Sequence, residues 1–293
     1  MRKNLCPPMA LGHGSGEAAD MKKIKRRTLL AAMLCTALDA AALSGCAAVQ
    51  EQKPQTELPG IVVGCDDYEP YSYIEADGNY SGIDVELAEE AFRRMGYEPQ
   101  FQLIHWEEKD ELLNSGTVDC LWSCFTMTDR EKLYRWAGPY LYSRHVVLGR
   151  SDSDIYTLAD LEGCRVGVQA TTKPESILLQ RTDPRIPEIG QLYSCSSLAE
   201  LHALLRKGYV DAIASHEESL TLLSEDKTDS YRVLDESLFT SELGVAFEKG
   251  THEELASQLT ATLHEMKTDG TIDDIVTRYG LDPQQAVWGG SAS

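Results

Sequence analysis

The side chains best suited to chemistry in this 293-residue sequence are its eight cysteines and seven histidines. Metal centres and nucleophilic sites need such residues at fixed spacings, and the histidines show none. The sequence also has no HExxH motif, no GxSxG motif and no glycine-rich phosphate loop. Cys120 and Cys124 lie roughly 13 Å apart along an expected strand, which is too far for a mutual disulfide. We therefore predict no metal, no cofactor and no enzyme activity, and interpret both cysteines as small buried residues.

One cysteine, Cys46, has a motif of its own at the end of an N-terminal leader. Residues 22–27 contain five basic side chains, and residues 29–38 form an apolar run too short to span a bilayer. This order is typical of a signal peptide. Residues 43–46 (LSGC) resemble the bacterial lipobox, in which the cysteine is acylated and becomes the mature N-terminus. We interpret residues 1–45 as a signal-peptide region with its true start at Met21, and predict lipidation of Cys46.

Charge separates this leader from the body of the chain. Residues 1–45 carry seven basic and three acidic residues, whereas residues 46–293 carry 20 and 44. A body this acidic argues against nucleic-acid binding, which needs basic clusters to neutralise phosphates. Residues 46–57 are polar and contain a proline, so we interpret them as a flexible, lipid-anchored tether. The anchor would hold the protein on the cell membrane, facing the extracellular or periplasmic side.

The body alternates strand and helix patterns, which predicts an α/β fold with sheets covered by helices. The pattern at 83–95 has apolar residues at helical spacing, with Asp84 expected as its cap and Gly96 as its stop. Capping boxes at Ser197 and Thr251 each open a further helix. The other expected helices lie at 109–114, from 128, at 174–180 and at 272–279. The expected strands lie at 61–63, 100–104, 118–123, 145–148, 165–169, 191–193 and 211–215.

The order of short motifs in this body resembles that of the family 3 extracellular solute-binding proteins of bacteria. The resemblance covers about residues 58–285. It rests on residues 63–71 (VGCDDYEPY), 82–88 (GIDVELA), 116–119 (GTVD), 126–130 (TMTDR), 138–140 (GPY), 158–163 (LADLEG), 166–172 (VGVQATT), 208–212 (GYVDA), 244–250 (GVAFEKG) and 269–271 (DGT).

This resemblance implies a periplasmic-binding-protein-like fold of type II. Two α/β lobes would be joined by two hinge crossovers, near 142–145 and 240–244, with a ligand cleft between them. The first lobe would be discontinuous, comprising residues 58–142 and 244–285, and the second lobe would comprise residues 146–239. Such proteins are substrate-binding receptors of ABC importers, so we expect a small polar solute, an amino acid foremost, as ligand. The partners would be that solute, a membrane permease and the membrane itself, with the receptor a monomer.

The resemblance also implies where the cleft would hold a ligand carboxylate. Arg130 has a planar guanidinium that can bind two carboxylate oxygens at once, and we expect it to do so. The backbone N–H of Thr126 and the helix N-terminus near Thr172 would add donors. This arginine stands one residue earlier than is usual in the family, because only Asp129 separates it from Thr128.

The remaining ligand contacts implied by the resemblance come from aromatic, hydroxyl and acidic residues. Tyr68 and Trp106 would sandwich the ligand side chain, where an aromatic wall suits an aliphatic stem or a cation. Asp66 would face the distal end of the ligand and favour a cationic or amide group. Ser123 and Thr126 would offer a carbonyl or hydroxyl oxygen to the ammonium.

The acid that usually receives the ligand ammonium on the second lobe is missing from this sequence. His216 stands at the expected position, and Glu217 follows it. Either Glu217 substitutes for the acid, or the ligand has no ordinary α-ammonium, or residues 216–218 are simply the solvated first turn of a helix. If His216 lines the cleft, its charge could make binding depend on pH.

Two other functions compete with the transport receptor. Some relatives on this fold are periplasmic dehydratases, in which an acid in the cleft protonates a leaving hydroxyl group. A sensory ligand-binding module for another kind of ligand is the second alternative. Nothing in the sequence marks a dehydratase acid, so we favour the receptor.

Overall fold

The computed structural model describes residues 58–181, 183–224 and 230–290. The predicted signal-peptide region, Cys46 and the predicted tether at 46–57 lie outside these described residues. Within the part of the chain that is described, no helix is both long enough and apolar enough to cross a membrane. The five cysteines of the described body are all free thiols.

The elements alternate along the chain as the sequence patterns predict. The strands are β1 (Gly60–Cys65), β2 (Tyr73–Ile74), β3 (Tyr80–Ser81), β4 (Glu98–Leu103), β5 (Cys120–Leu121), β6 (Arg135–Arg150), β7 (Arg165–Gln169), β8 (Gln191–Cys195), β9 (Ala212–His216), β10 (Tyr231–Val233) and β11 (Phe239–Phe247). The α-helices are α1 (Ile83–Met95), α2 (Lys109–Asn114), α3 (Lys173–Gln180), α4 (Leu198–Arg206), α5 (Glu217–Ser224), α6 (Glu253–Thr268), α7 (Thr271–Arg278) and α8 (Pro283–Ala286), and two short 3-10 helices are η1 (Trp106–Glu108) and η2 (Leu158–Leu161).

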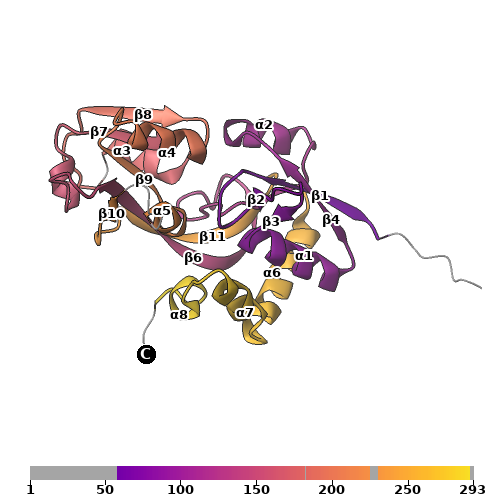
Figure 1. The fold of residues 1–293 in the computed structure, drawn as a ribbon. Coiled ribbons are helices and arrows are strands. Elements are labelled where there is room, and N and C mark those ends of the chain that lie inside the picture. Colours follow the sequence, from indigo (N-terminus) through magenta and orange to yellow (C-terminus); the bar gives the residue numbers. More distant parts are fainter. Residues whose placement is uncertain (1–57, 182, 225–229, 291–293) are drawn as a thin grey trace, which may run out of the picture. The chain divides into compact units, whose positions relative to one another are not determined.

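One mixed sheet runs through the body in the order β4-β1-β5-β11-β6-β9-β7-β8, with β10 paired to β6. β4, β1 and β5 are mutually parallel, and so are β8, β7 and β9. Each parallel group forms a lobe with its own helices: α1, α2, α6 and α7 in the first lobe, and α3, α4 and α5 in the second (Figure 1). The predicted α/β class with two lobes is therefore confirmed.

The two long strands β6 and β11 pass from one lobe to the other. Near its start β6 pairs with the end of β11, with Ala137 opposite Val245, and near its end it pairs with β9, with His145 opposite His216. Between these contacts, Ser143 of β6 lies opposite Ser241 of β11. The segments predicted as crossovers are thus an antiparallel pair of strands.

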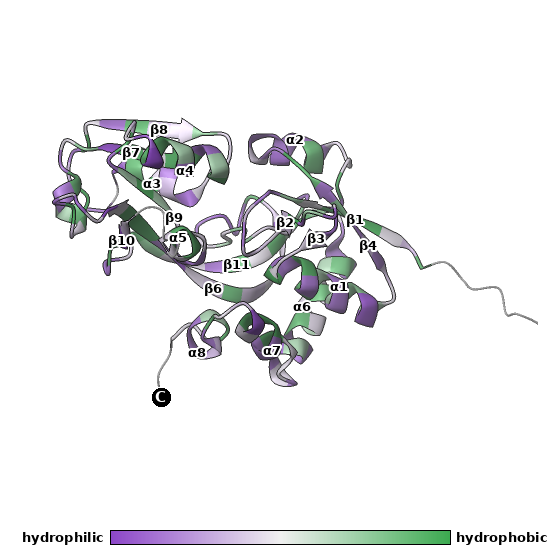
Figure 2. Cartoon of the chain, viewed as in Figure 1, coloured by the Kyte–Doolittle hydropathy of each residue, from purple (hydrophilic) through white to green (hydrophobic). Residues whose placement is uncertain are grey.

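Burial of one face of each helix gives the lobes their cores. In α1 the side chains of Ile83, Leu87 and Phe92 are fully buried, while the helix also carries exposed charged residues. Figure 2 shows this mixture of hydrophobic and hydrophilic residues on α1 and α6, which cover the sheet of the first lobe. A separate apolar cluster around Leu158, Val168 and Leu178 lies within the second lobe, into which the larger cluster also extends through Leu201 and Ile213.

Three local predictions are wrong, each because the backbone does something the pattern did not reveal. Residues from Thr128 form turns instead of a helix, since Asp129 adopts a left-handed conformation (φ 64°) that interrupts helical geometry. At the second expected capping box, His252 and not Thr251 precedes α6, and its side chain makes no capping bond. The third case is Asp84, which lies inside the first turn of α1 instead of capping it.

Asp84 instead fixes the loop that follows β5. Its buried carboxylate accepts a hydrogen bond from the backbone N–H of Cys124 at 2.5 Å. Cys124 has a positive φ of 39°, a conformation that non-glycine residues rarely adopt. Burial raises the pKa of Asp84 to about 7, because the charged form loses its hydration. This single contact therefore ties α1 to the loop that leads into the cleft.

We expect Asp84→Ala to lower the free energy of unfolding by about 1–3 kcal/mol, since the N–H of Cys124 would be buried without an acceptor. Urea denaturation at constant pH measures the loss. Asp84→Asn is the matched control, because its amide oxygen can still accept this bond, and it should lose less. Equal losses in the two variants would contradict the role of the hydrogen bond.

Candidate ligand-binding site

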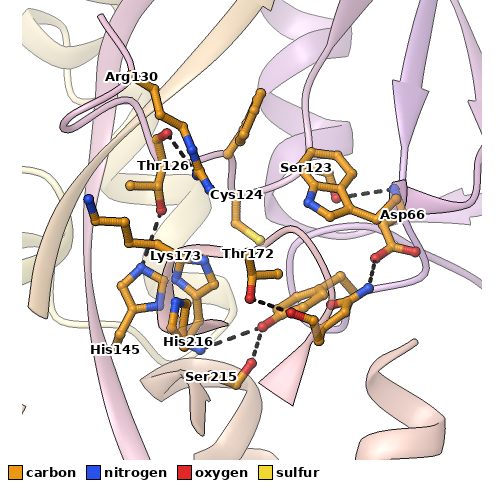
Figure 3. Close-up of a pocket in the computed structure, with 15 residues that line it drawn as sticks. Asp66, Ser123, Cys124, Thr126, Arg130, His145, Thr172, Lys173, Ser215 and His216 are labelled. Atoms are coloured by element: carbon orange, nitrogen blue, oxygen red, sulfur yellow. Dashed lines mark hydrogen bonds between the residues drawn. The ribbon is translucent and has the colours of Figure 1, made fainter. Parts of the chain in front are cut away.

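A cavity lies between the two lobes, and its volume of about 30 Å³ has room for one or two water molecules. The first lobe provides its walls from the ends of β1 and β5 and the loop before β6, and the second lobe provides the ends of β7 and β9 and the start of α3 (Figure 3). The lining residues are Asp66, Tyr68, Trp106, Ser123, Cys124, Phe125, Thr126, Arg130, His145, Gln169, Thr172, Lys173, Pro174, Ser215 and His216.

The structure brings together eight of the nine residues predicted to contact a ligand. These are Asp66, Tyr68, Trp106, Ser123, Thr126, Arg130, Thr172 and His216.

Glu217 lies elsewhere. It begins α5, and its carboxylate accepts a hydrogen bond from Arg144 Nη1 at 2.8 Å. Both side chains line a different cavity beside the hinge. The expectation that Glu217 reaches the cleft is therefore not met, and we remove it from the candidate site.

Seven lining residues were not predicted, although several had a signal in the sequence. Gln169 and Ser215 lie at the carboxyl ends of β7 and β9, where ligands of parallel sheets usually bind. Lys173 and Pro174 follow Thr172 directly in the first turn of α3. His145 had no such signal, because its position opposite His216 depends on the pairing of β6 with β9. The other two are Cys124 and Phe125.

Arg130 presents a cation to the cavity without a carboxylate of its own. Its guanidinium donates only to backbone carbonyl oxygens, at 3.4 Å to Thr126 and 3.2 Å to Thr171. Among the described residues no ion pair to Arg130 is formed. Arg130 reaches the cavity despite the shorter loop. The adjacent Glu131 instead accepts a hydrogen bond from the backbone N–H of Asp129. A guanidinium in this state suits an anion.

Asp66 lies at the other side of the cavity and is only 7% exposed. Its Oδ2 accepts a hydrogen bond from Gln169 Nε2 at 2.6 Å, and its backbone N–H donates to Ser123 Oγ at 3.2 Å. Burial raises the pKa of Asp66 to about 6, and the bond from Gln169 opposes this rise. The second amide atom, Gln169 Oε1, is buried without a partner in the described part of the chain. Together these oxygens form an acceptor pair.

Aromatic rings close two further sides of the cavity. Trp106 packs edge-on against Phe125, with ring centroids 4.9 Å apart. Tyr68 contacts His216 edge-on at 5.8 Å, and its hydroxyl shares a hydrogen bond with Ser215 Oγ. These rings offer apolar walls to a ligand stem while leaving its polar ends to the groups described above.

His145 and His216 both line the cavity and pack against each other, with ring centroids 4.0 Å apart and ring planes tilted by 45°. Burial, and to a lesser extent the charge of Arg130, lower the pKa of His216 to about 3. Burial likewise holds the pKa of His145 well below its usual value. Both rings are therefore uncharged at neutral pH. The hypothesis that the charge of His216 makes binding pH-dependent does not hold for this arrangement.

Direct hydrogen bonds join the two lobes around the cavity. Besides the Asp66–Gln169 and Tyr68–Ser215 contacts, Lys109 Nζ donates to Thr171 Oγ1 at 2.8 Å. Lys173 Nζ forms an ion pair with Asp129 at 2.6 Å. Ser219 Oγ donates to the carbonyl of Glu69 at 2.6 Å. The lobes are thus closed on each other, and any solute larger than water requires them to separate.

Comparison with known proteins identifies the relatives of this chain. Residues 61–282 match the family model described as bacterial extracellular solute-binding proteins, family 3. The L-cystine-binding protein TcyA of Bacillus subtilis is 28% identical over 217 residues, covering 72% of this chain and 77% of TcyA. The arginine-binding extracellular protein ArtP of the same organism is 28% identical, covering 73% and 82%. The crystal structure of Tv2483 bound to L-arginine is 26% identical with a TM-score of 0.69, covering 75% and 90%.

The raised pKa of Asp66 predicts a specific pH dependence of stability. Between its ordinary pKa of 3.8 and the value of about 6, the folded state binds more protons than the unfolded state. At low pH the protonated carboxyl therefore contributes roughly 2–3 kcal/mol to the free energy of unfolding, and this contribution is lost as the pH rises to about 6. We expect the unfolding free energy of the native protein, relative to Asp66→Asn, to decline between pH 4 and 6.5. Parallel profiles from urea denaturation would contradict this assignment.

Proposed function

Because the chain belongs to family 3 of the bacterial extracellular solute-binding proteins, we propose that it is the substrate-binding receptor of an ABC importer for an amino acid. It captures this solute between its lobes and delivers it to a membrane permease. The observation that carries the proposal is Arg130, a cation in a cavity between two lobes that has no carboxylate partner among the described residues. The curated relatives that bind cystine or arginine support an amino acid as ligand.

The first lobe holds most of the proposed binding groups. Arg130 binds the ligand carboxylate, and the backbone N–H of Thr126 adds a donor from the same lobe. Tyr68 and Trp106 pack against the stem of the ligand, and Ser123 lies at the Asp66 end of the cavity. Asp66 and Ser123 are joined within this lobe, whereas Tyr68 and Arg130 also contact the second lobe through Ser215 and Thr171.

Closure of the lobes then brings the second lobe into contact with the ligand. The ligand stabilises the closed form only through contacts that it makes in that form and not in the open one. Gln169, Ser215 and His216 are available for this purpose, and the N-terminus of α3 at Thr172 adds donors for the carboxylate. The permease would recognise the closed form, in which the lobes meet through the hydrogen bonds described above.

We also propose that a lipid on Cys46 anchors the receptor to the membrane. The basic cluster, the short apolar run and the LSGC motif support this, and the polar segment 46–57 gives the receptor a tether. Such an anchor keeps the receptor near its permease on the outer face of the membrane.

A dehydratase on the same fold remains the second candidate, because one cleft acid has a suitable pKa. Asp66 has a pKa of about 6, as a general acid needs. Gln169 occupies that carboxylate, however, and the curated relatives described above are binding proteins. A bound solute recovered unchanged by NMR after long incubation would favour the receptor, and a dehydrated product would favour the enzyme.

We expect Arg130→Ala to weaken binding of the best ligand by about 30-fold or more, because the ligand carboxylate would be buried without its cation. A thermal-shift screen of the 20 L-amino acids and L-cystine identifies the ligand, and calorimetry measures the variants. Arg130→Lys keeps the charge but not the planar fork, so its loss should be intermediate. Undiminished affinity in Arg130→Ala would contradict the carboxylate assignment.

For the anchor, we expect Cys46→Ala to move the protein from the membrane fraction to the soluble fraction of bacteria that express the full chain. Mass spectrometry of the native protein should find a mature N-terminus at Cys46 that carries acyl chains. Cys65→Ala is the control, since Cys65 is buried in β1 and should leave the distribution unchanged. An unchanged distribution of Cys46→Ala would overturn the anchor.

A further inference from the structure

The charges that line the cavity are separated in an unusual way. Among the described lining residues, Asp66 is the single carboxylate, and Arg130 and Lys173 are the cations. Figure 3 shows Asp66 and Arg130 at opposite sides of the pocket. A ligand therefore meets a positive end and a negative end.

The positive end offers no acid to a ligand ammonium. The Phe125 ring lies 5.4 Å from the Arg130 guanidinium, and His145 and His216 line the same pocket. Both histidines are neutral because burial lowers their pKa values. Lys173 is a second cation, and its partner Asp129 is 67% exposed outside the pocket. An ammonium next to the ligand carboxylate would thus meet neutral acceptors only, and hydrogen bonds to neutral groups are weaker than those to charged groups.

Two carboxylates nearby are held on the far side of the hinge. Glu217 is paired with Arg144. Glu218 accepts a hydrogen bond from Ser143 Oγ at 2.7 Å, and this same hydroxyl contacts His216 Nδ1 at 2.8 Å. Ser143 and His216 therefore stand between Glu218 and the ligand cavity. Both glutamates line the hinge cavity instead.

The negative end, in contrast, has buried oxygen atoms that can accept hydrogen bonds from a donor group of the ligand. Asp66 Oδ2 and the unpartnered Gln169 Oε1 are both buried, and Gln169 is only 2% exposed. One ammonium or guanidinium can donate to a carboxylate and an amide oxygen together. The distal end of a ligand that reaches from Arg130 to Asp66 would satisfy both atoms.

Resting on the proposed function, we propose that this receptor selects carboxylates with a distal cation, and that the α-ammonium contributes little to the binding affinity. Its ligand class is then the ω-amino and ω-guanidino carboxylates, with or without an α-amino group. His216 is the specificity-determining residue, because it puts a neutral ring where an acid would select for the α-ammonium. Asp66 and Gln169 determine the choice of the distal group.

Matched ligand pairs test this with the native protein. Compared with L-lysine, 6-aminohexanoate lacks only the α-ammonium, and L-norleucine lacks only the distal one. By calorimetry we expect 6-aminohexanoate to bind within about fivefold of L-lysine, and L-norleucine to bind at least about 10-fold more weakly, the loss expected for a charged hydrogen bond. L-arginine and 5-guanidinopentanoate form a second pair with the same expectation. A loss of 100-fold or more on removing the α-ammonium would overturn the proposal.

Substitutions of His216 and Asp66 test the two ends of the cavity separately. In His216→Asp the new carboxylate should raise the preference for L-lysine over 6-aminohexanoate by about 10-fold or more. His216→Asn is the matched control and should leave this preference near that of the native protein. Asp66→Asn should weaken both ligands while leaving their ratio unchanged. An unchanged ratio in a folded His216→Asp would overturn the role of His216, and the native ligand pairs decide the proposal if that variant does not fold.

The outcomes also separate this inference from the proposed function. If L-amino acids bind and their analogues without the α-ammonium do not, the inference fails and the amino-acid receptor stands. If no carboxylate-bearing solute in either the screen or the ligand pairs binds, both fail together. Binding of 6-aminohexanoate that Arg130→Ala abolishes would support both.

Discussion

The antiparallel pairing of β6 with β11 is the constraint on which the rest of this structure depends. Both strands belong to both lobes, so their register decides which side chains meet in the cleft. The same pair holds the loop of the first lobe, because the N–H of Met127 donates to the carbonyl of Glu242 and that of Gly244 donates to the carbonyl of Phe125. From β6, His145 is then set opposite His216 of β9. A change of register at the hinge would displace the walls of the cavity from both lobes at once.

Burial at this hinge also sets the electrostatics of the cleft. The two histidines lose their charge because water is excluded from them, and Asp66 becomes harder to ionise for the same reason. Arg130 remains charged because a guanidinium cannot be deprotonated in a protein. The pocket therefore has a positive end with Arg130 and Lys173, neutral histidine rings, and a weak acid, Asp66, at its other side, although the chain as a whole is strongly acidic.

The sequence predicted the parts of this arrangement that depend on local pattern. Helix α1 ends at Gly96 as expected, and Arg130 reaches the cavity despite its shorter loop. The sequence could not predict contacts that depend on tertiary pairing. His145 lines the cavity because β6 pairs with β9, and Asp84 accepts a hydrogen bond from a loop 40 residues away. The prediction that Glu217 contacts the ligand is wrong for a simpler reason. His216 ends a strand and Glu217 begins a helix, so these neighbours face different cavities.

The closed lobes place an energetic condition on any ligand. The Asp66–Gln169 hydrogen bond is already satisfied across the cleft, so a ligand that pushes the two side chains apart must replace this contact with one at least as favourable. An apolar end cannot do so, since it would leave a buried carboxylate and a buried amide without partners. A distal ammonium can, because it donates to both oxygens and its charge stabilises the ionised carboxylate. The proposed selection of the distal group thus follows from the cost of opening a contact that the protein already makes.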